Sequence, residues 1–135
     1  MIEMIVVIVL IGILAVVLLP RASIIGGSSP IAADLVASDI RVTQREAMTR
    51  ETPLSVSFTA GSAVYKYATD AVGKGEVRDL LELGPSTSIG LAKTITFNSL
   101  GEPLGLALPL AIAVTDGATI KTVTVEPYTG KVTTQ

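Results

Sequence analysis

Five carboxylates in the C-terminal half of the chain could in principle supply a general acid–base pair. They are Asp79, Glu82, Glu102, Asp116 and Glu126. Such a pair needs two carboxyl groups held in one site at different pKa values. These five are scattered over expected loops and strand ends, so we interpret them as surface charge and predict no catalytic residue.

Nucleophilic and metal chemistry find little support in the composition. The chain has no cysteine and no histidine, which excludes disulfides, cysteine nucleophiles, histidine-based triads and the usual zinc sites. Gly73-Lys74-Gly75 matches only a fragment of a phosphate-binding loop. Asp70 and the oxygens near it lack the ligand spacing of a calcium loop. We therefore expect no metal, no cofactor and no enzymatic activity.

The charge pattern also argues against nucleic-acid binding. The formal net charge is −2, and Lys121 and Lys131 are the only cations in the last forty residues. Phosphate binding needs clustered cations, and its strength follows their number. We therefore expect no nucleic acid among the partners.

Glu3 is the residue whose setting is most informative. It is a lone carboxylate ahead of a sixteen-residue run without charge, which Pro20 and Arg21 close. As a helix this run would be about 24 Å long, a marginal span for a hydrocarbon core of about 30 Å. A charged side chain inside a membrane helix costs roughly 2.5–3.5 kcal/mol at the centre, so a carboxylate there needs a cationic partner. The residues of the expected membrane or filament-core helix are Met4, Ile5, Val6, Val7, Ile8, Val9, Leu10, Ile11, Gly12, Ile13, Leu14, Ala15, Val16, Val17, Leu18 and Leu19.

A break is expected after this helix. Pro20 disrupts helical hydrogen bonding, and Gly26, Gly27 and Pro30 argue against a continuous helix through the following segment. An ordinary signal anchor is the simpler reading of the apolar run, but a secretory signal begins with positive charge and ends in small residues. We divide the chain into a helix and neck at 1–29 and a globular head at 30–135.

The head begins with an expected amphipathic helix over 30–50. Ser29 is a candidate N-cap, Pro30 a first helical residue, and Pro53 limits the C-terminal end. Small and apolar residues at three- and four-residue spacings predict one face packed on a sheet. We interpret the charged residues of this helix as a solvated face, or as contacts between subunits: Asp34, Asp39, Arg41, Arg45 and Glu46.

From Leu54 onwards the hydrophobic period changes from that of a helix to that of strands. Alternating residues predict strands at 54–58, 63–67, 93–97, 110–114 and 120–125, and we also assign 76–83 as a strand. Asp116-Gly117 is the strongest hairpin signal, and a short strand closes the chain after Lys131. The predicted fold is α+β: a long N-terminal hydrophobic helix, kinked or broken near Pro20–Pro30, packed on an antiparallel β-rich head.

The stretch from Ile2-Glu3 to Pro20, with Gly12 and Ala15 inside it, resembles the start of mature type IV pilins and type II secretion pseudopilins. The Ile-Thr-Phe unit with Gly101 and Pro103, and the terminal Thr-Gly-Lys-Val, resemble the GspH/FimT group of minor pilins and pseudopilins. The chain lacks the family's Phe-Thr pair and basic leader, and Met1 stands where the family has Leu. We expect either a start codon placed too late or a fragment.

The resemblance implies a structural subunit of a pilus-like or pseudopilus filament, more as a minor or tip subunit than as the main subunit of a homopolymer. Glu3 would be an assembly residue that meets the N-terminal amine of a neighbouring subunit. Implied partners are other pilins or pseudopilins, a prepilin peptidase that precedes N-methylation, and an inner-membrane assembly platform. The implied location is the inner membrane with a periplasmic head, then a periplasmic pseudopilus or an extracellular pilus. A DNA-uptake pilin and a membrane-anchored binding protein that never polymerises are less favoured alternatives.

Overall fold

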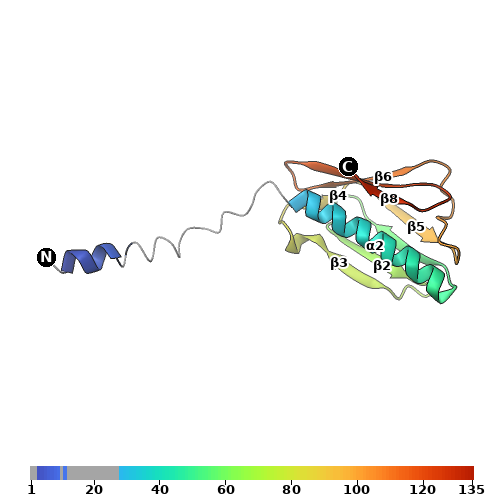
Figure 1. Cartoon of the computed structure of the whole chain (residues 1–135), viewed down its shortest axis with the longest axis horizontal. Helices are drawn as coiled ribbons and strands as arrows, with labels where there is room; N and C mark the ends of the chain where they lie inside the picture. The colour runs from blue at the N-terminus through green and yellow to red at the C-terminus, as the bar shows by residue number, and fades with distance from the viewer. Residues whose placement is uncertain (1–2, 10, 12–27) are drawn as a thin grey trace.

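The computed structural model describes residues 3–9, 11 and 28–135 (Figure 1). Residues 3–9 and 11 are helical. The head contains helix α2 (Ser28–Arg50) and the short 3₁₀ helix η1 (Leu80–Glu82). Its strands are β1 (Leu54–Phe58), β2 (Val64–Thr69), β3 (Glu76–Asp79), β4 (Ser88–Ile89), β5 (Lys93–Phe97), β6 (Leu110–Thr115), β7 (Ile120–Val125) and β8 (Val132–Thr134).

Helix α2 forms where the sequence predicts a helix, and it ends at Arg50, followed by Glu51 in the left-handed region. Pro30 lies in the first described turn, where its missing N–H has no intrahelical partner to lose. Ser28 and Ser29 are already helical, so Ser29 is not the N-cap and the helix is not broken at Pro30. The other predicted break residues, Pro20, Gly26 and Gly27, lie outside the described residues.

Two four-stranded antiparallel sheets form the β part of the head. The first sheet has the order β3-β2-β1-β5, and the second has the order β4-β6-β7-β8. Strand β1 buries alternate residues, as expected for a strand with one face on the core. Strands β6 and β7 pair in register from Leu110 opposite Val125 to Thr115 opposite Ile120, and the Asp116-Gly117 turn joins them.

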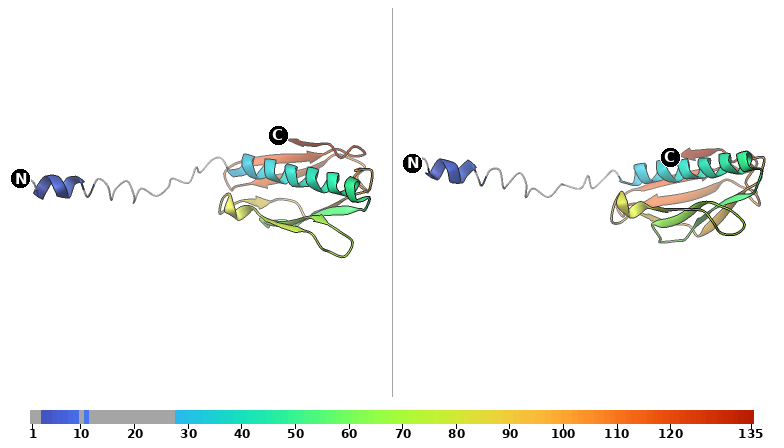
Figure 2. Two further views of the ribbon diagram at one scale, coloured as in Figure 1. Left: turned by 60° about the horizontal axis from the view of Figure 1, so that its bottom comes forward. Right: turned by 90° about the horizontal axis from the view of Figure 1, so that it is seen from below.

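Helix α2 packs against both sheets (Figures 1 and 2). Its small residues allow this close approach, and Ala32, Ala33 and Ala37 are buried. The larger core side chains come from both sheets and the helix, and they include Ile40, Leu54, Tyr65, Phe97, Ile112 and Val123. Helix α2 therefore covers both sheets, and its buried residues join theirs in one hydrophobic core.

Backbone contacts also join the two sheets directly. The Gly61 N–H donates to the Ile89 carbonyl at 2.8 Å, and the Ile89 N–H donates to the Ser62 carbonyl at 3.0 Å. Ile89 belongs to β4, which the sequence does not predict because two residues carry no periodicity. The segment 76–83, assigned as one strand, is β3 followed by η1, because the Asp79 carboxylate accepts from the Leu81 N–H and starts a helical turn.

Candidate assembly surface and polar contacts of the head

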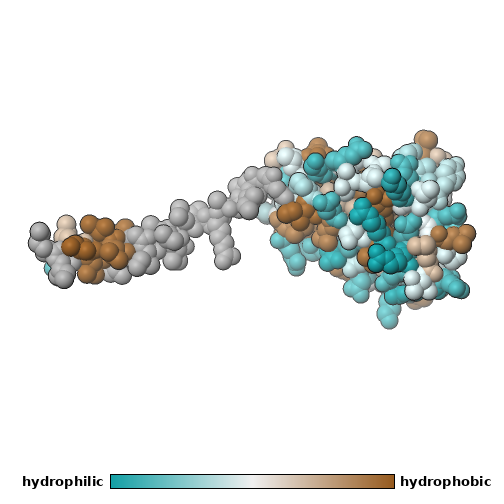
Figure 3. Space-filling model, in the orientation of Figure 1, coloured by the Kyte–Doolittle hydropathy of each residue, from teal (hydrophilic) through white to brown (hydrophobic). Residues whose placement is uncertain are grey.

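The described N-terminal helix presents apolar side chains around its whole circumference. Its seven apolar residues are 49% to 70% exposed, from Val7 to Met4. Six of them are consecutive, at positions 4–9, so they cannot share one face of a helix with 3.6 residues per turn. Figure 3 shows this surface in brown where it faces the viewer. A helix that is hydrophobic all round is stable only when it is surrounded by other apolar groups.

These exposed fractions indicate how much free energy would be gained if other apolar groups covered the helix. Fully burying one Val, Ile or Met side chain contributes about 1.5–3 kcal/mol. Covering all the exposed side chains of this helix would therefore contribute several times that free energy. No helix formed by the described residues is long and apolar enough to cross a membrane. Glu3 is exposed at the start of the described helix, and residues 10 and 12–19 of the predicted core helix lie outside the described part.

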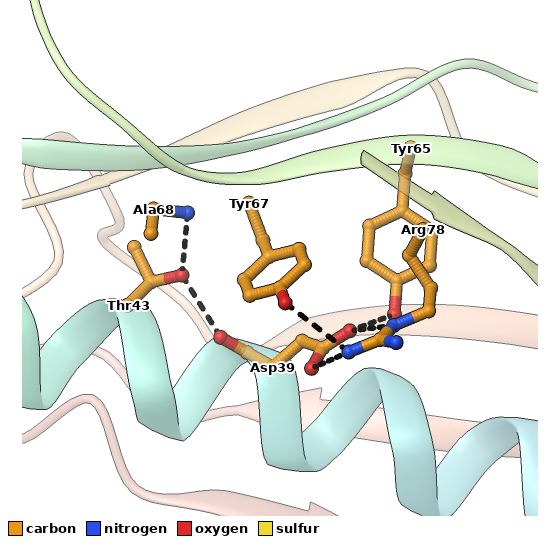
Figure 4. A network of polar contacts seen from close by, with 6 residues as sticks. All are labelled: Asp39, Thr43, Tyr65, Tyr67, Ala68 and Arg78. Carbon is orange, nitrogen blue, oxygen red and sulfur yellow. Dashed lines mark hydrogen bonds and ion pairs between the residues drawn. The ribbon is translucent and has the colours of Figure 1, made fainter. Parts of the chain in front are cut away.

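A buried carboxylate on α2 organises the contact between the helix and the first sheet (Figure 4). Asp39 is 3% exposed and accepts hydrogen bonds from the Tyr65 hydroxyl at 2.7 Å and from Arg78 Nε at 2.9 Å. Arg78 Nη2 donates to the second Asp39 oxygen at 3.1 Å and to the Tyr67 hydroxyl at 3.2 Å. The prediction that Asp39 is part of a solvated face is therefore wrong.

The pKa values in this cluster follow from burial and charge. Burial raises the pKa of Tyr65 well above its ordinary value, and the hydrogen bond to Asp39 adds to the rise. The hydrogen bond to Asp39 likewise raises the pKa of Arg78. The guanidinium lies 5.2 Å from the centre of the Tyr67 ring, a cation–π distance. These contacts all join α2 to strands β2 and β3 of the first sheet.

Beside the ion pair, α2 also binds an irregular part of β2. Thr43 Oγ1 donates to the Asp39 carbonyl at 2.8 Å and accepts from the Ala68 N–H at 3.0 Å. Ala68 has a φ of 50°, and the β1–β2 register shifts at this end of the strand pair. The threonine therefore satisfies a backbone donor that the bulge leaves unpaired.

Asp116 forms a second polar centre at the opposite sheet. Hydrogen bonds from the backbone N–H groups of Thr119 and Ala118 hold the pKa of its carboxyl well below the ordinary value. Its other oxygen accepts from Ser28 Oγ and from the Ser29 N–H. The carboxylate is thus a structural acceptor, which the interpretation as simple surface charge misses.

No group of His, Cys, Asp or Glu side chains within residues 3–9, 11 and 28–135 could hold a metal ion. Three of the five carboxylates considered as acid–base candidates have separate structural partners. Asp79 starts η1, Glu102 accepts from the Asn98 amide, and Asp116 closes the β6–β7 turn. The described structure therefore brings no two of these three into one hydrogen-bonded pair.

No protein-family model and no curated protein sequence matches the chain. Two crystal structures of the type IV minor pilin FimU from Pseudomonas aeruginosa have a similar fold. For one of them the TM-score is 0.61 at 12% identity, and the match covers 78% of this chain and 91% of the chain in that structure. The other, in a second crystal form, has a TM-score of 0.64 at 11% identity and covers 79% and 87%.

The chain has a type IV pilin-like fold. The resemblance found in the sequence is thus confirmed at the level of fold. Because the identity is low, the likeness concerns the pilin-like architecture and not particular residues.

Sequence reasoning missed the two polar centres of this pilin-like head, although a signal exists for one of them. Asp39 lies three residues after Val36 and four before Thr43, on the helix face that packs on the sheets. This spacing puts the carboxylate on the same helix face as Val36, which the sequence predicts to pack on a sheet. For Asp116 the turn was predicted, but nothing in the sequence indicates that it meets a helix 87 residues away.

Proposed function

We propose that this chain is a structural subunit of a type IV pilus-like or type II secretion pseudopilus filament, and that it acts as a minor or tip subunit. The observation that carries the proposal is the helical segment described at residues 3–9 and 11, whose apolar side chains are exposed all round. A pilin-like head attached to such a helix has a surface that copies or relatives can cover by packing helices together. The minor role is supported by the two matching structures, both of a minor pilin.

Glu3 is the proposed assembly residue. A carboxylate surrounded by apolar helices is unfavourable unless a cation meets it, and the N-terminal amine of a neighbouring subunit would supply that charge. The same helix would reside in the inner membrane before assembly, with the head in the periplasm. A prepilin peptidase and an assembly platform would act on this form of the protein. The head contributes shape and contacts, with no chemistry required of it.

The proposal is tested by exchanging Glu3 for Gln in the cells that make the protein and recovering sheared filaments. We expect membrane levels to stay the same and the amount of this subunit in filaments to fall about tenfold or more, because the uncharged side chain no longer attracts a cationic partner. Glu82→Gln, an exposed carboxylate of η1, is the control and should incorporate normally. Normal incorporation of Glu3→Gln would refute the assembly role.

The subunit ratio in the same filaments tests the minor role. Intact-mass analysis of the recovered subunits gives the share of this chain. A trace amount beside another pilin supports the minor or tip position, whereas dominance of this chain would make it the main subunit of the filament.

A further inference from the structure

The N-terminal end of α2 is tied to the β6–β7 turn by one carboxylate. Asp116 Oδ1 accepts from the N–H groups of Ala118 at 3.0 Å and Thr119 at 2.8 Å, which closes the turn. Asp116 Oδ2 accepts from Ser28 Oγ at 3.1 Å and the Ser29 N–H at 3.2 Å. The same residue therefore shapes a hairpin and holds a helix end that lies far from it in the sequence.

Two further contacts close this junction. The Oγ atom of Ser29 lies 2.6 Å from Thr119 Oγ1, and Ser29 is fully buried. On another side, Gly84 approaches so closely that a Cβ there would lie 2.9 Å from Ser28 Oγ and 3.1 Å from Thr87 Oγ1. The first described turn of α2 is thus hydrogen-bonded to the β6–β7 turn and packed against the loop between η1 and β4.

This junction is where the chain enters the head from its N-terminal segment. The first N–H groups of a helix have no intrahelical acceptors, so a helix loaded at this end frays from it unless other groups bind those donors. Asp116 supplies an acceptor that is fixed by its own turn. Strand β7, which follows that turn, pairs with β6 along its whole length, so the acceptor is anchored in the middle of the second sheet.

We infer that Asp116 is a mechanical latch: it couples the first turn of α2 to the β6–β7 hairpin, so that tension on the N-terminal segment passes into the second sheet instead of peeling α2 from the head. The latch itself is a property of the fold. Only the origin of the tension, a filament held by its N-terminal helices, rests on the proposed function.

Site-resolved hydrogen exchange of the full chain in detergent micelles tests the latch without any filament. In Asp116→Ala we expect the amides of Ser29, Ala32 and Ala33 to exchange about tenfold faster, as for loss of a helix cap, while the amides of β1 and β5 change little. Asp70→Ala is the matched control. Asp70 also closes a turn, accepting from the Val72 and Lys74 N–H groups, but no contact joins that carboxylate to α2 in the described head.

Unchanged exchange at the start of α2 in Asp116→Ala would overturn the latch. Equal acceleration in all strands would also overturn it, because the residue would then stabilise the head as a whole. Normal incorporation of Glu3→Gln into filaments would refute the proposed function but would not change the hydrogen-exchange result. The two proposals can therefore be refuted independently.

Single-molecule pulling gives the mechanical readout. The chain has no cysteine, so Leu100→Cys, in a turn where Leu100 is 74% exposed, provides a unique handle opposite an N-terminal tag. We expect the first rupture of Asp116→Ala to occur at lower force than in the parent and to release a length that matches the first turns of α2. Equal first-rupture forces in the two chains would contradict the proposal.

Discussion

At the residue scale, the Asp39 ion pair illustrates how a charge is tolerated inside a small head. The carboxylate gives up hydration but receives three hydrogen bonds, two of them from a guanidinium. A buried charge is acceptable only when it is paired and hydrogen-bonded in this way. The cluster links α2 to two strands of the first sheet, because Tyr65 lies in β2 and Arg78 lies in β3.

Removing this carboxylate should therefore be costly. We expect Asp39→Ala to lower the free energy of unfolding by about 3 kcal/mol, because it leaves Arg78 and the Tyr65 hydroxyl without their acceptor. Arg78 keeps 34% of its side chain exposed and can regain water, which limits the loss. Urea unfolding of the full chain in micelles, followed by circular dichroism, measures the change.

The Glu46–Arg50 pair on the same helix is the control for Asp39. It is a partly exposed pair one helical turn apart, with 58% of the Arg50 side chain and 35% of the Glu46 side chain exposed, and Glu46→Ala should cost about 0.5 kcal/mol or less. Similar small losses in both variants would show that the Asp39 cluster has no special role in stability.

At the scale of elements, α2 is fastened near both of its ends, to different parts of the sheets. Near its C-terminal end, the Gln44 side-chain amide donates to the Gly101 carbonyl at 2.7 Å and to the Thr129 carbonyl at 3.0 Å. Gly101 follows the first sheet and Thr129 lies in the β7–β8 turn. A Cβ at Gly130 would lie 2.6 Å from the Gln44 nitrogen, so this close crossing requires glycine.

This bridge predicts the effect of a substitution that replaces a single non-hydrogen atom. In Gln44→Glu a carboxylate replaces the amide and faces two carbonyl oxygens without a proton to donate. We expect the free energy of unfolding at neutral pH to fall by about 2 kcal/mol, because two acceptors lose their donor and the new charge repels them. Thermal unfolding of this variant at pH 7 checks the value.

Gln44→Met serves as the matched variant, since it keeps the length of the side chain without the charge. Gln44→Met should lower the free energy of unfolding by less than Gln44→Glu does. A loss in Gln44→Glu no larger than in Gln44→Met would contradict the argument that repulsion at the two carbonyls matters.

Most elements of the head could be predicted from the sequence, because their periodicity is strong. The alternation Leu54-Ser-Val56-Ser-Phe58 and the Asp116-Gly117 turn each indicate a local structure directly. The division of the strands into two sheets, the pairing of β1 with β5, and the contact of Asp116 with Ser29 depend on residues far apart in the chain. Such partners leave no local pattern, so the sequence could not supply them.

At the scale of the whole molecule, the core of the head draws only on residues from Ala32 to Val132, with none from the described N-terminal helix. A region with its own core can fold alone. The predicted boundary at 29–30 remains a prediction, and the contacts of Ser28 and Ser29 with Asp116 favour keeping both serines with the head.

We therefore expect a chain that begins at Ser28 to be a monomeric, β-rich protein that unfolds cooperatively without detergent. The full chain in the same buffer should associate, because its N-terminal helix stays uncovered. Sedimentation velocity of the two proteins measures their association, and circular dichroism measures their folding. An unfolded or aggregated head would mean that the N-terminal segment contributes to folding.

The contacts of α2 also set an order of events during synthesis. Ser29 meets Thr119, Arg41 binds the Val132 carbonyl and Asp34 binds Thr134, so the partners are made 90, 91 and 100 residues later. When α2 leaves the ribosome, strands β6, β7 and β8 of the second sheet do not yet exist, and such distant contacts form late. The head can complete its folding only after translation has reached β8. By then the hydrophobic segment that precedes the head has already left the ribosome.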